Sequence, residues 1–285
     1  MPEPDGRQAR ATAPSSRDDV DENEVVTQSV QETFRRSVDE GVLRLERPLP
    51  ALVATGLVGG LDVSIGVIAL LLVESKTQNH LLGSLAFGIG FLALTLANSE
   101  LFTENFLVPI MTVVAKDAPW WSVLRLWAGT ALFNLIGGWI AMGLAMMAFP
   151  PLRNTARAVG FESMRIGVGR QAFASAIVGG VLITVMTWME RGTDSVPAKI
   201  ASAWAIAFLL AGLPVQHAIV ISIEAFAALH AGAAFGYAHW LAMFGWAALG
   251  NVLGGIVLVT GLRLMQVGRR GVAREQAREK PAVDL

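Results

Sequence analysis

Two polar segments interrupt long apolar runs of the chain, and they carry the side chains best suited to chemistry. Residues 98–105 read Asn-Ser-Glu-Leu-Phe-Thr-Glu-Asn, and residues 212–217 read Gly-Leu-Pro-Val-Gln-His. The histidine of the second segment, His217, titrates near neutral pH and can lend or accept a proton. The hydroxyl of Thr103 in the first segment can donate and accept hydrogen bonds. These two side chains are the first candidates for handling a proton or a small polar molecule.

The first segment also contains two carboxylates, Glu100 and Glu104, and the amide of Asn105. A charge at the centre of a membrane costs at least about 2.5 kcal/mol. Irregular backbone is tolerated at that depth only where it is buried in protein or lines a water-filled cavity. A loop between two half-helices meets this condition, and its N–H groups attract anions. Two interpretations stay open, because the carboxylates either cap the half-helices or lie beside a pore.

The sequence gives little support for an enzyme, a metal site or a nucleic-acid-binding protein. The motifs His-Glu-x-x-His and Gly-x-Ser-x-Gly do not occur, and Asp62 and Glu224 are isolated carboxylates. The chain has no cysteine, and its formal net charge is −1. We therefore expect no enzymatic activity, no cofactor, no metal and no nucleic-acid partner.

The elements that must position these side chains are helices that span a membrane. Hydrophobic residues make up 53% of the 285-residue chain, and the mean hydropathy is +0.52. Of the 45 charged residues, 18 lie in residues 1–47 and 9 lie in residues 263–285, which leaves 18 for the long middle segment. Soluble domains carry more charge than this middle segment does. The composition therefore predicts an all-α integral membrane protein.

A membrane-spanning helix needs roughly 20 mostly apolar residues, and the sequence contains six such regions. The second is interrupted at residues 98–105 and the fifth near residues 212–217. Six spans place both termini on one side, and the flanking Lys and Arg residues favour the cytoplasmic side of a bacterial-type inner membrane. The expected spans cover residues 49–73, 81–115, 122–149, 168–189, 197–230 and 238–266.

The polar segments at the two ends of the chain are expected to lie outside these spans. Residues 1–34 are rich in Asp, Glu, Ser and Pro, and we expect a disordered cytoplasmic tail there. Residues 35–268 form the predicted membrane domain, and residues 269–285 a cytoplasmic C-terminal tail. Residues 31–47 have an amphipathic pattern, and such a helix either lies on the membrane surface or is exposed to solvent before the first span.

The two halves of the membrane domain, about residues 49–149 and 168–266, repeat one another. Each half holds three spans, so the halves insert with opposite orientations. Inverted repeats with discontinuous helices are typical of membrane transport folds. We therefore predict an inverted repeat of three plus three helices, with spans two and five broken. Three pairs of segments share a similar offset: 134–138 with 251–255 (117, both Asn-x-x-Gly-Gly), 59–60 with 179–180 (120, both Gly-Gly), and Thr103 with His217 (114).

These motifs resemble the formate/nitrite transporter family over about residues 35–268. The resemblance rests on Glu-Leu-Phe-Thr at 100–103 in a broken span, on the histidine of the broken fifth span, and on Gly-Asn-x-x-Gly-Gly at 250–255. The longer run through Asn105 is similar to the YfdC-like subgroup. The resemblance implies a homopentamer of aquaporin-like protomers, each with its own pore. It also implies that Thr103 and His217 face each other in the middle of that pore.

The resemblance further implies apolar constrictions above and below this pair. Apolar rings exclude hydrated ions, whereas a weak acid can cross as the neutral species after it takes a proton. Asn251 either supports the loop or lines the pore, and both interpretations stay open. The residues that the resemblance assigns to the constrictions are Leu101, Phe102, Phe87, Phe91 and Leu210.

Two positions depart from the family pattern. Family members often carry a vestibule lysine early in the fourth span, whereas this chain has Arg170 about one position away. Arg170 either replaces that lysine or is an interfacial arginine whose stem lies along apolar surface. Thr184 stands where the family has an asparagine in the middle of the fourth span. These departures bear on the transported solute more than on the fold.

The expected function is a channel or transporter for small monovalent anions of weak acids, such as formate, nitrite or hydrosulfide, with a flux that depends on pH. Its partners would be the anion or its neutral acid, the lipid bilayer and further copies of the chain. One alternative is a pore-like scaffold or receptor that passes no anion. Another is a channel for neutral solutes, although the paired Asn-Pro-Ala breaks of aquaporins are missing.

Overall fold

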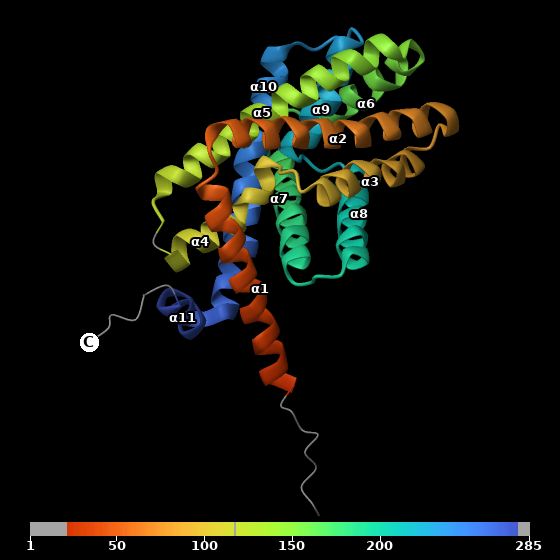
Figure 1. Ribbon diagram of the computed structural model, residues 1–285. Helices are drawn as coiled ribbons and strands as arrows, with labels where there is room; N and C mark the ends of the chain where they lie inside the picture. Colours follow the sequence, from red (N-terminus) through yellow and green to blue (C-terminus); the bar gives the residue numbers. More distant parts are fainter. Residues whose placement is uncertain (1–21, 117, 279–285) are drawn as a thin grey trace, which may run out of the picture.

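The computed structural model describes residues 22–116 and 118–278, and these residues form helices joined by short connections. Helix α2 lies beside α3, and α7 lies beside α8 (Figure 1). In chain order the helices are α1 (Glu22–Leu45), α2 (Leu49–Thr77), α3 (His80–Ala97), η1 (Phe102–Phe106), α4 (Val108–Lys116), α5 (Trp120–Ala148), η2 (Pro150–Leu152), α6 (Arg153–Arg165), α7 (Arg170–Arg191), α8 (Val196–Gly212), α9 (Ala218–His230), α10 (Tyr237–Val252), η3 (Leu253–Thr260) and α11 (Gly261–Ala277).

Five of the described helices are long and apolar enough to cross a membrane. They are α2, α3, α5, α7 and the helical segment formed by α10, η3 and α11, which is kinked at Gly268. The predicted fifth span is divided between α8 and α9, which have 17 and 13 residues. The prediction of an all-α membrane protein is therefore confirmed, whereas the count of six spans stays a prediction.

Both predicted interruptions fall at helix ends. Helix α3 ends at Ala97, after which Asn98 adopts a left-handed conformation with φ 53°. A 3₁₀ turn, η1, then precedes the half-helix α4. Helix α8 ends at Gly212, before Pro214, whose missing N–H and fixed ring oppose a continuing helix. The residues 100–105 and 215–218 in these two loops are buried, so the irregular backbone lies inside the protein.

The repeated Gly-Gly pairs allow the first long helix of each half to pack closely against the third. A Cβ atom added to Gly60 of α2 would overlap the backbone carbonyl oxygen of Asn134 in α5. A Cβ atom added to Gly180 of α7 would overlap the carbonyl oxygen of Asn251 in α10. The same backbone contact therefore occurs in both halves, which supports the predicted repeat, whereas the opposite orientation of the two halves stays a prediction.

We expect Gly60→Ala and Gly180→Ala each to lower the yield of assembled protein strongly. Backbone atoms lie on the far side of each contact, and overpacking a tight core costs about 1–3 kcal/mol. The measurement is the yield of monodisperse protein by size exclusion in detergent. Gly245→Ala is the control, because a Cβ atom there meets nothing within 4 Å. A yield of Gly60→Ala equal to that of the control would contradict the packing argument.

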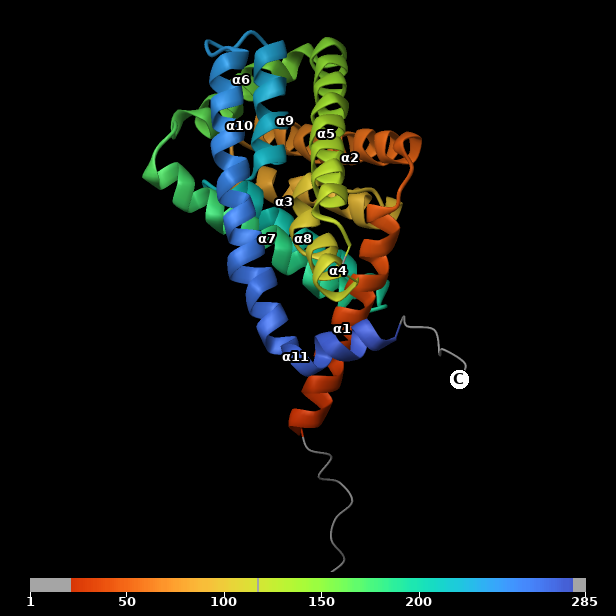
Figure 2. The ribbon, with the colours of Figure 1, turned by 90° about the vertical axis from the view of Figure 1, so that its left-hand side faces the viewer.

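The two ends of the described chain pack together at one end of the molecule, and α6 lies at the other end (Figures 1 and 2). Phe34 and Val38 of α1 are buried in one cluster with residues of α4 and with Val267 of α11. Gln31 Nε2 also donates a hydrogen bond of 3.1 Å to the Val267 carbonyl. Gly268 has φ +71°, a left-handed conformation that suits glycine, and it turns the last part of α11 toward α1.

These helices correct the predicted N-terminal tail. Residues 22–34 belong to α1, although they were expected in the disordered tail. Residues 269–277, expected as part of a C-terminal tail, form the end of α11, and the cytoplasmic location of both tails stays a prediction. Composition alone did not predict the apolar contact between α1, α4 and α11 that holds them. The amphipathic segment 31–47 therefore packs on other helices of the protein. The two expected locations were the membrane surface and solvent, and neither includes this packing. The remaining tail residues, 1–21 and 279–285, lie outside the described residues.

Charged side chains along α1 add local support to this helix. Glu32 accepts hydrogen bonds from Arg35, at 2.5 Å, and from Arg36, at 2.9 Å. These hydrogen bonds lower the pKa of Glu32 from its ordinary value to about 2. Pairs three or four residues apart on a helix stabilise it by a few tenths of a kcal/mol each.

Candidate functional site

An asparagine from the third long helix holds the first interrupted segment in place. Asn134 Oδ1 of α5 accepts a hydrogen bond of 2.8 Å from the backbone N–H of Phe102. Its Nδ2 atom donates to the carbonyl oxygens of Gly56, at 2.8 Å, and Glu100, at 2.9 Å. The side chain is fully buried, so its hydrogen bonds replace those that water would supply.

Asn251 of α10 holds the second interrupted segment in the same way. Its Oδ1 atom accepts from the N–H of Ala218 at 2.9 Å. Its Nδ2 atom donates to the carbonyl oxygens of Ala176, at 2.6 Å, and Gln216, at 2.9 Å. Of the two open interpretations for Asn251, the structure therefore favours support of the loop, because the amide is fully buried and its bonds go to backbone.

The asparagine contacts correct the predicted correspondence between the two breaks. Asn134 binds the backbone on either side of Leu101, and Asn251 binds the backbone on either side of His217. Leu101, rather than Thr103, is therefore the repeat partner of His217. The offset of 114 joined two residues that meet in space but do not occupy equivalent positions.

Thr103 and His217 meet in the interior between the two loops. The Thr103 Oγ1 atom lies 2.8 Å from Nε2 of His217, and both residues are fully buried. Nδ1 of His217 accepts a hydrogen bond of 3.3 Å from the N–H of Val220, which caps α9. Since a backbone N–H can only donate, Nδ1 carries no hydrogen, and the hydrogen of the neutral ring lies on Nε2. Nε2 thus donates to Thr103, whose own hydroxyl hydrogen can be offered to an acceptor.

The buried interior that holds this polar pair also contains a large apolar cluster. The five residues expected at constrictions all belong to one buried cluster, which links both loops to α3 and α8. The ring centroids of Phe87 and Phe91 lie 5.6 Å apart. Phe102 instead packs edge-on against Phe106, with a centroid distance of 5.1 Å, and against Trp127. The two hydrogen-bonding groups therefore lie in a dry, apolar setting, where each polar contact counts for more than in water.

The acidic loop residues are bound by arginines of α1. Arg44 is buried, and its Nη1 atom lies 3.6 Å from Glu100 and 3.9 Å from Glu104. The same atom donates a hydrogen bond of 3.1 Å to Oδ1 of Asn105. Arg47 also pairs with Glu100. The carboxylates are therefore held in an ionic cluster at the α1 end of the loop, which neither open interpretation had included.

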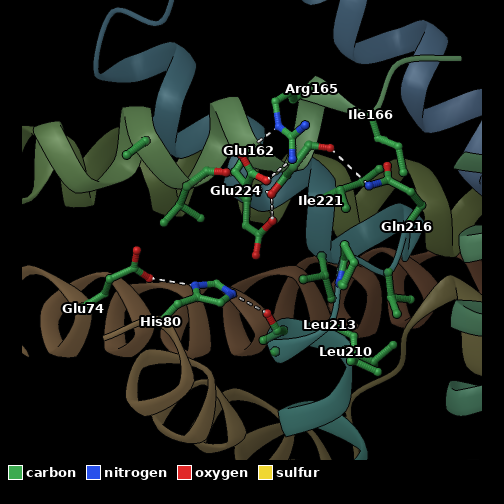
Figure 3. A pocket seen from close by; sticks show the side chains of 18 of the residues that line it. Glu74, His80, Glu162, Arg165, Ile166, Leu210, Leu213, Gln216, Ile221 and Glu224 are labelled. Carbon is green, nitrogen blue, oxygen red and sulfur yellow. Dashed lines mark hydrogen bonds and ion pairs between the residues drawn. The ribbon is translucent and has the colours of Figure 1, made fainter. Parts of the chain in front are cut away.

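A cavity of about 720 Å³ lies at the α6 end of the molecule, and we call it the α6 cavity. It is lined by the second loop, including Gln216, and by Leu210 of α8 (Figure 3). Its ionisable lining residues are Glu74, His80, Glu162, Arg165 and Glu224.

Arg170 begins α7, is exposed, and is not among the residues that line the α6 cavity. The lining cation is Arg165 of α6, which pairs with Glu162 at 2.5 Å. Three glutamates accompany it, so Arg165 does not make this cavity a positively charged vestibule. Thr184 is fully buried in α7, and its hydroxyl oxygen has no hydrogen-bond partner in the described structure.

Sequence reasoning missed two sets of residues at the site. Asn134 was visible in the repeated Asn-x-x-Gly-Gly motif, and its equivalence to Asn251 could have assigned it the same role. Arg44 and Arg47 are among the flanking arginines that precede the first expected span, and their positions were used only to predict orientation. Nothing in the local sequence around either arginine indicates a contact with Glu100, more than 50 residues away.

Comparisons with known proteins agree with this architecture. The inner membrane protein YfdC of Escherichia coli (strain K12) is 29% identical over 199 residues, which cover 65% of this chain and 62% of YfdC. The formate channel BtFdhC of Bacillus thuringiensis is 26% identical over 235 residues, or 76% of this chain and 87% of that one. A solved structure described as an FNT family ion channel superposes with a TM-score of 0.71 at 18% identity, covering 82% and 96% of the two chains.

A second solved structure is described as a pentameric formate channel with formate bound. It superposes with a TM-score of 0.63 at 21% identity, covering 75% of this chain and 95% of that one. The likeness to both solved structures concerns the fold. The family model described as formate/nitrite transporter matches residues 31–265, which is most of the sequence. The chain therefore belongs to the formate/nitrite transporter family.

Proposed function

We propose that this protein is a channel or transporter for formate and similar small monovalent anions of weak acids. The observation that carries the proposal is the buried Thr103–His217 pair, which offers a hydroxyl hydrogen between apolar side chains. An anion is poorly solvated by apolar side chains, whereas its neutral acid crosses them at lower cost. The flux is therefore expected to rise as the pH falls. Nitrite and hydrosulfide share the small size and weak-acid chemistry of formate.

The relatives support the choice of formate as the first solute to test. One curated relative is named a formate channel, and one solved neighbour was determined with formate bound. That neighbour is also pentameric, and we extend the same assembly to this chain, with one pore in each protomer. The exposed apolar side chains of α2, α5 and α10 provide the area that neighbouring protomers and lipid would cover. We place both termini in the cytoplasm, with α6 on the opposite side of the membrane.

The test is uptake of formate into proteoliposomes that contain the full chain. We expect saturable uptake that exceeds the leak of empty liposomes and increases between pH 8 and pH 5. Nitrite, hydrosulfide and a neutral solute such as glycerol complete the panel. Uptake of every anion at the level of empty liposomes would overturn the proposal and favour a scaffold or receptor. Uptake of glycerol without uptake of anions would instead favour a neutral-solute channel.

A further inference from the structure

The α6 cavity contains one buried carboxyl group that the proposed pore does not yet use. Glu224 lies on α9, two helical turns beyond His217, and is only 7% exposed. It lines the cavity together with Val220 and with Leu210, one of the expected constriction residues. No ion pair of Glu224 occurs within residues 22–116 and 118–278. A carboxyl group buried without a cationic partner favours its neutral form.

The contacts of Ser163 are compatible with a protonated Glu224. Its Oγ atom is 3.0 Å from the carbonyl oxygen of Val159, one turn earlier in α6, and also contacts Oε2 of Glu224. A hydroxyl group has a single hydrogen, and the Val159 carbonyl can only accept one. Both contacts are satisfied together when Ser163 donates to Val159 and a protonated Glu224 donates to Ser163. In Figure 3 the Glu224 side chain, which belongs to α9, lies close to Glu162 of α6.

The other ionisable groups that face this carboxyl are already engaged with one another. His80 of α3 contacts Glu74 of α2 at 3.0 Å and the Ala211 carbonyl of α8 at 3.0 Å. Arg165 pairs with Glu162 on α6. The cavity thus holds two paired carboxylates and one carboxyl group without a cation. An anion that enters it would find Glu224 as a buried carboxyl group in the same cavity lining as Leu210.

We propose that Glu224 is a proton-exchange residue that converts an entering weak-acid anion into its neutral acid before it crosses the apolar constriction. The O–H bond of the Glu224 carboxyl breaks, an O–H bond forms on the solute carboxylate, and Glu224 is left as a carboxylate. Water in the cavity then returns a proton to Glu224. Each cycle moves one proton with one anion, so no other reactant is needed. This inference rests on the proposed function and names a residue through which that function acquires its pH dependence.

The test compares Glu224→Gln with Glu162→Gln in proteoliposomes loaded with a pH indicator, with formate as the solute. Both variants remove one carboxyl group from the same cavity, but Glu162 is exposed and paired with Arg165. Glutamine at 224 keeps the size of the side chain and an N–H donor for Ser163, but it cannot release a proton. We expect formate uptake at pH 7 to fall at least tenfold in Glu224→Gln, with loss of the accompanying proton uptake. Glu162→Gln should stay within twofold of wild type.

Equal effects of the two variants would overturn the proposal, since they would show only a change in cavity charge. Wild-type uptake and pH dependence in Glu224→Gln would overturn it as well, while leaving the proposed function intact. Wild-type flux at the level of empty liposomes would instead overturn the proposed function itself. If Glu224→Gln does not assemble, Ser163→Ala provides the second test. Its pH midpoint of uptake should move, because the hydroxyl contacts the carboxyl directly, and an unchanged midpoint would overturn the proposal.

Discussion

Replacing His217 with phenylalanine is expected to reduce formate uptake to the level of empty liposomes, a loss of at least a hundredfold. Phenylalanine has a similar volume, so the buried site stays filled, but both ring nitrogens disappear. The Thr103 hydroxyl then loses its hydrogen-bond partner at 2.8 Å. The N–H of Val220 also loses its acceptor, the His217 ring nitrogen that caps α9. Leaving a buried polar group without a partner costs about 1–3 kcal/mol. Uptake into proteoliposomes measures the effect, and size exclusion checks that oligomers still assemble.

Two further variants separate the two roles of His217. Asparagine is a good helix cap, but its shorter side chain does not reach Thr103, so His217→Asn should keep α9 capped and still lose transport. Thr103→Val keeps the shape of the threonine and removes the hydroxyl, and we expect a similar loss. Wild-type uptake in His217→Asn would show that the histidine acts as a cap only. Wild-type uptake in Thr103→Val would remove the hydroxyl from the mechanism.

The fold could be predicted from the sequence because its strongest determinants are local or repeated. Apolar runs long enough to span a membrane give the helices, and Pro214 marks the end of α8. The Gly-Gly pairs and the Asn-x-x-Gly-Gly motifs recur because each half uses the same contact between a glycine and an asparagine backbone. A repeated contact leaves a repeated sequence, which is visible without an alignment.

The ionic cluster at the loop could not be predicted in the same way. Arg44 and Glu104 lie 60 positions apart and meet through the packing of α1 on α4, which depends on a few apolar side chains such as Phe34. Flanking arginines are common beside spans, so their type and position indicated only orientation. The pairing of Thr103 with His217 was predicted through the family resemblance, whereas the repeat itself relates His217 to Leu101.

The second large effect is expected at Arg44, which is nearly fully buried beside Glu100 and Glu104. Arg44→Met keeps much of the side-chain volume but leaves the carboxylate of Glu104 without its nearby cation. Removing one partner of a buried ion pair costs about 3–5 kcal/mol, because the remaining charge is uncompensated. We expect a markedly lower midpoint of thermal unfolding in detergent, measured by intrinsic tryptophan fluorescence.

Arg35→Ala is the matched control on the same helix, since Arg35 also pairs with two carboxylates but is 43% exposed. Exposed pairs contribute about 0–1 kcal/mol.

The double variant Arg44→Met with Glu104→Gln distinguishes charge from packing. Arg44 also pairs with Glu40, at 2.9 Å. In this background Glu40 keeps Arg191 and Glu100 keeps Arg47 as partners, so Glu104 is the carboxylate that Arg44→Met leaves uncompensated. If the buried charge causes the loss, neutralising Glu104 restores most of the unfolding midpoint, and the two substitutions are strongly non-additive. If the loss comes from the hydrogen bond between Arg44 and Asn105, the double variant is no more stable than Arg44→Met. If the double variant regains the unfolding midpoint, the ion pairs of Arg44 are what attach α1 to the loop. The stability of the loop that carries Thr103 would then depend on α1, a helix outside the repeated spans.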